Sequence, residues 1–92
     1  MRRLVMINLE SANIADFEAY EAVVLPLVRK HGGRVEMRVR SISGDREVHL
    51  LYFPDSEAFE AYRQDPRRLE GSYLWEASRA QSEVVLVDLV EP

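Results

Sequence analysis

His49 is the residue of this sequence best suited to proton transfer at neutral pH. A histidine titrates near pH 6.5, so it can act as a general base or a general acid. His49 lies in the mostly apolar segment Val48–Phe53, which is typical of a central strand. A hairpin turn at Gly44-Asp45 places Arg40 opposite His49, with Arg38 one step away on the diagonal. These cations would lower the pKa of His49, and the three side chains could hold a carboxylate or a phenolate.

The same residues also fit a purely structural role. In that interpretation the histidine and both arginines face a subunit interface and form ion pairs across it with Glu36 or Glu47. Ion-pair networks of this kind also perturb pKa values. The sequence therefore leaves a catalytic and a structural hypothesis open for His49.

Aromatic side chains with a polar tip are frequent on the elements that would wall a cavity between sheet and helices. They are Tyr20, Tyr52, Tyr62, Tyr73 and Trp75. A flat aromatic substrate could stack there while a tyrosine hydroxyl or His49 binds its oxygen. Core packing explains the same residues at helical spacing and is the favoured interpretation. Asn8, on the first strand, completes the candidate substrate-binding residues together with the two arginines.

The other titratable residues show no catalytic pattern. His31 is expected in the last turn of a helix, where the helix dipole favours a cation. The two histidines lack a spaced carboxylate partner, so no metal site is expected. Four glutamates are expected on solvated helix faces: Glu18, Glu21, Glu57 and Glu60.

Apolar residues that recur every three and four positions predict the helices that position these groups. The first helix begins at Ile14 with Asn13 as its cap and ends at Gly32-Gly33. Pro26 is expected to kink or break it near Val24-Leu25.

The second helical region begins at Pro54–Glu57 and stops at Gln64. Asp65-Pro66 then starts a further helical piece, which Gly71 weakens in its middle.

Four segments have the patterns of strands. Leu4–Leu9, Val48–Phe53 and Val84–Val90 are apolar runs, whereas Arg34–Arg40 alternates between charged and apolar residues. The order strand, helix, strand, strand, helix, strand predicts an α+β fold, the ferredoxin-like βαββαβ arrangement. We expect a four-stranded antiparallel sheet with the helices on one face, strands one and three being central.

The fourth strand predicts a dimer. It has two apolar faces but lies at an edge of the sheet, where a monomer would leave one face and one backbone ladder open to water. A second copy is the natural cover. Two such sheets packed face to face would form an eight-stranded dimeric α/β barrel with the helices outside.

Three passages resemble a known group of proteins. Val24–Gly33, Tyr52–Ala58 and Tyr62–Pro66 are similar to uncharacterised bacterial members of the dimeric α/β-barrel superfamily. The resemblance implies a homodimer and a pocket between sheet and helices. Antibiotic-biosynthesis monooxygenases and muconolactone-isomerase-like enzymes are similar to it in fold, but fold analogy does not carry a reaction.

Asn8 and Trp75 also resemble residues that shape the cofactor site of haem-degrading members. Those relatives ligate iron with a helical histidine, whereas Trp75 is surrounded here by Glu76, Ser78 and Arg79. The departure predicts no haem, with Trp75 in the packing and Asn8 satisfied locally. No cofactor of another kind is expected either.

Composition limits the classes of function. The 92 residues have room for one domain, residues 1–92. A net charge of −4 argues against nucleic-acid and anionic-membrane partners. Cysteine is absent, and no segment has the length of a signal peptide core or membrane span, so a cytoplasmic protein is expected. The hypotheses are a cofactor-free oxygenase or isomerase acting on a small apolar or aromatic metabolite, and a non-catalytic ligand-binding or dimerisation module.

Overall fold

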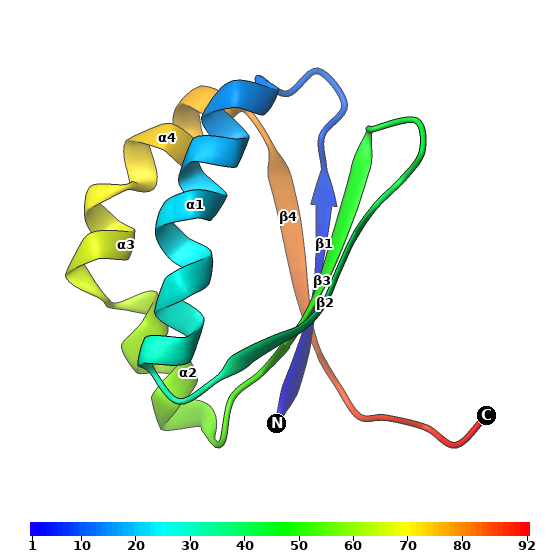
Figure 1. Cartoon of the computed structure of the whole chain (residues 1–92), viewed down its shortest axis with the longest axis vertical. Helices are drawn as coiled ribbons and strands as arrows, with labels where there is room; N and C mark the ends of the chain where they lie inside the picture. Colours follow the sequence, from blue (N-terminus) through cyan, green and yellow to red (C-terminus); the bar gives the residue numbers. More distant parts are fainter.

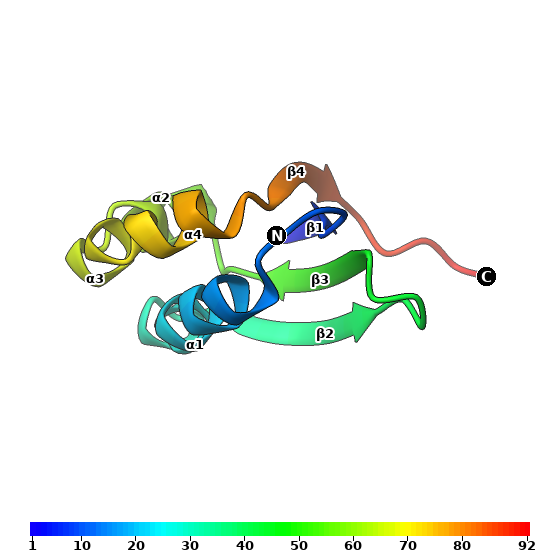
Figure 2. The same cartoon turned by 90° about the horizontal axis from the view of Figure 1, so that it is seen from above.

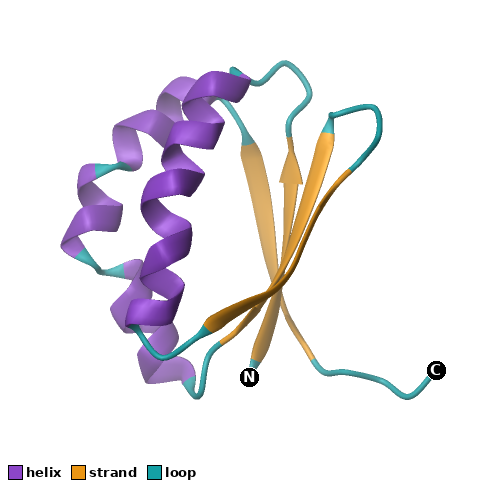
Figure 3. Ribbon diagram, in the orientation of Figure 1, coloured by secondary structure: helices purple, strands orange, loops and turns teal.

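A computed structural model describes all residues, 1–92, and has the predicted two-layer architecture. Its elements are β1 (Arg2–Asn8), α1 (Ile14–Lys30), β2 (Arg34–Arg40), β3 (Arg46–Tyr52), α2 (Ser56–Arg63), α3 (Pro66–Glu70), α4 (Ser72–Ser78) and β4 (Gln81–Val87). The helices form one layer against one face of the sheet, and the opposite face is bare (Figures 1 and 3). No helix combines the length and the hydropathy that a membrane span requires.

The strands form one antiparallel sheet in the order β2-β3-β1-β4. This confirms the prediction that β1 and β3 are central and that β2 and β4 are the edges. Seen from above, the sheet lies beside the helical layer, and the C-terminal residues after β4 run away from both (Figure 2). The arrangement leaves the helix-facing side of the sheet to form the core and any internal site.

Local capping defines the helix starts as predicted. The side chain of Asn13 accepts from the backbone N–H of Asp16, and Asp55 and Asp65 cap α2 and α3 in the same way. The predicted break near Val24-Leu25 is wrong, because α1 continues through Pro26 to Lys30. Packing of α1 along the sheet and α4 outweighs the one backbone hydrogen bond that proline removes.

The third helical piece divides where glycine weakens it. Gly71 separates α3 from α4, so the segment predicted as a single piece forms two short helices. Glycine has the largest conformational entropy to lose in a helix, so the helical segment is least stable at this position.

The β2–β3 register differs from the predicted one by two residues. Arg38 pairs with His49 and Arg40 pairs with Glu47, because the connection is a five-residue turn, 41–45, and not the two-residue turn predicted. A β-bulge between Val35 and Met37 adds one further residue to β2, so that Tyr52 pairs with Arg34. The two-residue shift keeps the side chains from Met37 to Arg40 on their predicted faces, since strand side chains alternate with a period of two. The bulge changes this alternation in the part of β2 that precedes Met37.

The core consists of two apolar clusters between the sheet and the helices. One contains Leu27, Val28, Leu51, Phe53 and Tyr62, and the other contains Ile7, Leu9, Phe17 and Ala80. Val5, on the central strand β1, packs against both. The buried core therefore extends along β1 and β3, where the apolar runs predicted it.

Strand β4 is more exposed within one chain than its sequence predicts. Val84 and Leu86, on the side that faces the helices, are 50% and 60% exposed, so the predicted burial of both faces is wrong for the isolated chain. The strand also ends at Val87, and the apolar residues Leu89 and Val90 continue beyond the sheet. No helix packs closely over β4, and this leaves room for a cavity.

Candidate active site

A cavity of about 550 Å³ lies between the sheet and the helical layer. Sixteen residues line it, ten of them hydrophobic, and they come from every strand except β2 and from all four helices. Its aromatic residues are Tyr20, Phe59, Tyr62 and Trp75, and its polar residues are Glu21, His49, Arg63, Arg68, Ser72 and Ser82. The volume and the apolar lining with few polar groups are typical of a small-molecule site.

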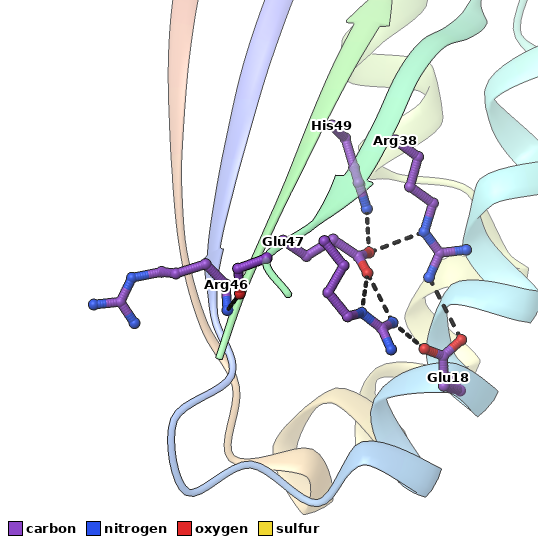
Figure 4. Close-up of polar contacts among 7 residues, drawn as sticks. Glu18, Arg38, Arg46, Glu47 and His49 are labelled. Carbon is purple, nitrogen blue, oxygen red and sulfur yellow. Dashed lines mark hydrogen bonds and ion pairs between the residues drawn. The ribbon is translucent and has the colours of Figure 1, made fainter. Parts of the chain in front are cut away.

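His49 reaches this cavity from the middle of β3 and is held by Glu47 of the same strand. Two residues apart, both side chains point to the helix-facing side, and His49 Nε2 lies 2.6 Å from Glu47 Oε2. The histidine is 3% exposed and the glutamate 2%. Arg46, which is adjacent to Glu47, points to the opposite side of the sheet (Figure 4).

Two arginines from the neighbouring strand surround Glu47. Arg38 Nε donates to Oε2 at 2.9 Å, and Arg40 Nε donates to Oε1 at 2.8 Å. Both arginines also bind Glu18 on α1, so the cluster joins the edge strand to the first helix (Figure 4). The ion pairs predicted across a subunit interface are thus formed by Glu47 within one chain.

These contacts keep Glu47 ionised and His49 neutral at pH 7. Burial would raise the pKa of Glu47, but hydrogen bonds from His49, Arg38 and Arg40 outweigh it and hold the pKa below 4.5. Desolvation lowers the pKa of His49 below 6.5, and the charges of both arginines add to this while Glu47 opposes it. Because an ionised carboxylate only accepts, the shared proton lies on Nε2, and Nδ1 is the nitrogen left to accept a proton.

Glu21 is a cavity residue that the sequence interpretation missed. It is 5% exposed, lines the cavity and forms no hydrogen bond, so the predicted solvated position is wrong. Burial raises its pKa to about 7. Its spacing from Phe17 and Val24 places it within the buried stripe of α1, and that spacing was the available signal. Glu18 is also engaged in the arginine cluster, while Glu57 and Glu60 are exposed as predicted.

Aromatic groups and one cation form the remaining wall. The rings of Tyr20 and Trp75 are tilted against each other with centroids 5.3 Å apart. The Arg68 guanidinium lies 5.2 Å from the ring centroid of Tyr62, and its Nε is buried without a hydrogen-bond partner. Burial raises the pKa of both tyrosines, so their hydroxyls remain protonated donors.

Comparisons with solved structures agree on the architecture. SnoaB of Streptomyces nogalater, described as a cofactor-independent oxygenase, has a TM-score of 0.72 and 18% identity over 99% of this chain and 95% of its own. A putative antibiotic biosynthesis monooxygenase of Nitrosomonas europaea has a TM-score of 0.63 and 12% identity, over 95% and 98% of the two chains. Rv0793 of Mycobacterium tuberculosis has a TM-score of 0.71 and 15% identity, over 98% of this chain and 96% of its own.

The chain has the ferredoxin-like α+β fold of these proteins. This confirms the fold that the resemblance in the sequence implied. No family model and no curated protein matches the chain, and identities this low show the fold alone. What the site does must therefore be argued from its own side chains.

The candidate residues Asn8, Tyr52 and Tyr73 lie outside the cavity. Asn8 and Tyr52 point to the bare face of the sheet, where Asn8 Oδ1 accepts from the Glu10 N–H and from Arg46, both at 2.9 Å. This confirms the local satisfaction predicted for Asn8. Tyr73 is 66% exposed on α4. The prediction that both tyrosines wall the cavity is wrong, because each belongs to the opposite face of its element.

Arg38, Arg40 and His31 bind carboxylates outside the cavity. Arg38 and Arg40 hold Glu47 and do not line the cavity. His31 lies at the end of α1 as predicted, and its Nε2 is 2.7 Å from Asp65, which also binds Lys30 at 2.8 Å. This contact joins the end of α1 to the start of α3. No group of three or more histidine, aspartate or glutamate side chains is arranged to hold a metal ion.

Proposed function

We propose that this protein is a cofactor-free oxygenase acting on a small aromatic or otherwise apolar metabolite, with His49 as the general base. The observation that carries the proposal is the buried pair of His49 and Glu47 at the wall of an aromatic cavity. A neutral imidazole whose tautomer is fixed by a carboxylate is arranged to accept a proton from a bound substrate. The similarity to SnoaB, a cofactor-independent oxygenase, supports the same reaction class.

The reaction requires a substrate that can itself reduce dioxygen. His49 Nδ1 removes a proton from an activated C–H group, and the resulting carbanion is stabilised by the ring of the substrate. The carbanion transfers electrons to dioxygen and forms a new C–O bond. When the O–O bond breaks and the second proton of a CH₂ group is lost, the carbon becomes a carbonyl and the other oxygen atom leaves as water. Tyr20 or Tyr62 can donate a hydrogen bond to the substrate oxygen.

Oxygen consumption tests this proposal directly. We expect the purified protein, freed of metals and flavins, to consume dioxygen with a substrate such as anthrone and to form the quinone. Incorporation of one atom from ¹⁸O₂ into the carbonyl, measured by mass spectrometry, would support it. A rearranged product formed without oxygen uptake would replace oxygenation with isomerisation. Saturable binding of anthrone and related aromatic compounds without any turnover would contradict catalysis and favour a ligand-binding module.

We also propose that two copies pair through the bare face of the sheet. The strand registers align one apolar row on that face across all four strands, formed by Met37, Leu50, Leu4 and Val85. Val39, Val48 and Met6 form a second row beside it. An exposed apolar surface that crosses a whole sheet is typical of an association surface. A second copy is the occupant that also fits the exposed edge strand β4.

A charge in the apolar face is expected to dissociate this dimer. Val39 lies on the edge strand β2 and is 49% exposed in one chain, so we expect the fold to tolerate the substitution Val39→Asp. We expect the dimer dissociation constant to rise at least about tenfold, because the aspartate loses its hydration in the interface. Sedimentation equilibrium measures the constant. Leu69→Asp on α3 introduces the same charge on the helical side and is the control. A wild-type monomer at micromolar concentration would contradict the dimer.

A further inference from the structure

Arg68 places an unneutralised cation at the wall of the cavity. Its Nε is buried and has no hydrogen-bond partner. Arg63, the other arginine that lines the cavity, is exposed and pairs with Glu60 at 3.1 Å. A buried N–H of a guanidinium without an acceptor is unfavourable unless a ligand supplies one. The guanidinium interacts with the Tyr62 side chain, so it is the Nε–H of Arg68 that lacks an acceptor at the cavity wall.

Glu21 is the carboxyl group that could neutralise Arg68, but it does so only when ionised. It is 95% removed from solvent, forms no hydrogen bond and lines the same cavity. The charges of Arg38 and Arg68 lower the pKa of Glu21, and those of Glu47 and Glu18 raise it. His49 lines the same cavity. Desolvation and the two other glutamates favour its protonated form, which leaves the charge of Arg68 uncompensated.

The surroundings of these two residues are rich in hydrogen-bond donors. The hydroxyls of Tyr20 and Tyr62 are protonated, Arg68 Nε carries a hydrogen, and a protonated Glu21 adds a fourth donor. We call these four residues the donor wall. Trp75 and Phe59 provide flat apolar surface in the same cavity. The combination suits an aromatic ring that carries an anionic oxygen.

We infer that the cavity binds an aromatic carboxylate, with the carboxylate on the donor wall and with a proton taken up by Glu21. The inference rests on the proposed function, since it names the substrate class of the same cavity. A carboxylate is preferred over a phenol because an ordinary phenol, with a pKa near 10, is neutral at pH 7 and cannot compensate Arg68.

The pH dependence of binding follows from the charge of Glu21. Below about pH 7 the residue is mostly protonated, donates a hydrogen bond to the ligand and leaves Arg68 free to bind it. Above that pH it ionises, repels the ligand carboxylate and competes with it for Arg68. Because one proton is linked to binding, the dissociation constant rises by at most about tenfold per pH unit above pH 7. The lowered pKa of His49 places its titration at a more acid pH.

Calorimetric titration with 2-naphthoate and the neutral 2-naphthamide tests the inference between pH 6 and 9. We expect tighter binding of the naphthoate, with proton uptake seen as a dependence of the binding heat on the ionisation enthalpy of the buffer. Glu21→Gln should abolish both the proton uptake and the loss of affinity above pH 7. Arg68→Gln should weaken naphthoate binding at least about tenfold and leave naphthamide binding unchanged. Arg67→Gln, on the exposed side of the same helix, is the matched control.

Equal affinity for the acid and the amide, or a pH dependence that persists in Glu21→Gln, would overturn the inference. Thermal melting of each variant shows that a loss of binding is not a loss of folding. Binding needs no oxygen, so the binding experiment can fail or succeed independently of the test for oxygenation. Naphthoate binding with the expected proton uptake but no oxygenation of any substrate contradicts the oxygenase alone, and oxygenation without preference for a carboxylate contradicts the donor wall alone.

Discussion

Replacing His49 with glutamine is expected to lower kcat/KM for oxygenation at least ~100-fold, the usual contribution of a positioned general base. Glutamine can still donate a hydrogen bond to Glu47 but cannot accept a proton, so the substrate retains its site and loses its base. The buried pair with Glu47 is replaced by a neutral hydrogen bond of similar shape. Oxygen uptake at saturating and limiting substrate concentration measures the effect.

The pH profile separates a catalytic from a structural role of His49. Its pKa is lowered, so the imidazole is neutral above pH 6.5, and the rate at saturating substrate should fall on the acid side as the pH drops through the lowered value. This acid limb should be absent in His49→Gln. His31→Gln is the matched control, because His31 binds Asp65 at the end of α1 and does not line the cavity. A His49→Gln variant with the wild-type rate would eliminate the proposed mechanism.

Replacing Glu47 with leucine is expected to reduce the free energy of unfolding by about 3 kcal/mol, because removing one partner of a buried ion pair leaves the other charges uncompensated. The value lies at the lower end of the usual range, since Arg38 and Arg40 are each about one third exposed and retain Glu18. Urea denaturation at pH 7 measures it. Glu60→Leu on α2 is the control, and it should change stability much less because solvent screens the exposed pair of Glu60 with Arg63.

Glu47 also has a positioning effect that stability alone does not report. Its hydrogen bond and charge raise the pKa of His49 against desolvation, so Glu47→Gln should lower that pKa further, as followed by NMR of the imidazole protons. The folded-state pKa of Glu47 is below 4.5, so its stabilisation is complete above pH 4.5 and is lost as the pH falls through the folded value. The stability difference between wild type and Glu47→Leu should therefore shrink in acid. A constant difference would contradict the ionised Glu47.

Much of the architecture follows from local patterns in the sequence. Asn13 caps the helix that it was predicted to cap, and Asp55 and Asp65 cap helices that begin where the sequence predicted. A cap is an interaction between residues two or three positions apart, so it can be predicted locally. The strand order follows from the βαββαβ order of elements, whose crossovers place β1 and β3 at the centre of the sheet. The β2–β3 register was not predictable in this way, since the longer turn is closed by hydrogen bonds from Ser41 and Ser43 to Asp45.

The candidate site was only partly predictable. His49, Tyr20, Tyr62 and Trp75 were named from residue type and periodicity, and all four line the cavity. Asn8 and Tyr52 were excluded only when the pleat of the sheet placed them on the bare face. Whether a strand residue lines the cavity depends on which face of the sheet its side chain occupies, and neighbouring residues along a strand alternate between the two faces.

The sequence by itself determined the order of elements, the helix caps, the alternating faces of the strands and the position of His49 on a central strand, because these depend on neighbours along the chain. Only the tertiary structure decided that Glu47 is enclosed by two arginines and that Glu21 is buried without a partner. The charge state of a carboxyl group depends on solvent and on partners from distant segments. Neither is encoded in the few residues beside it, so the chemistry of the site emerges only after β2, β3 and α1 have packed together.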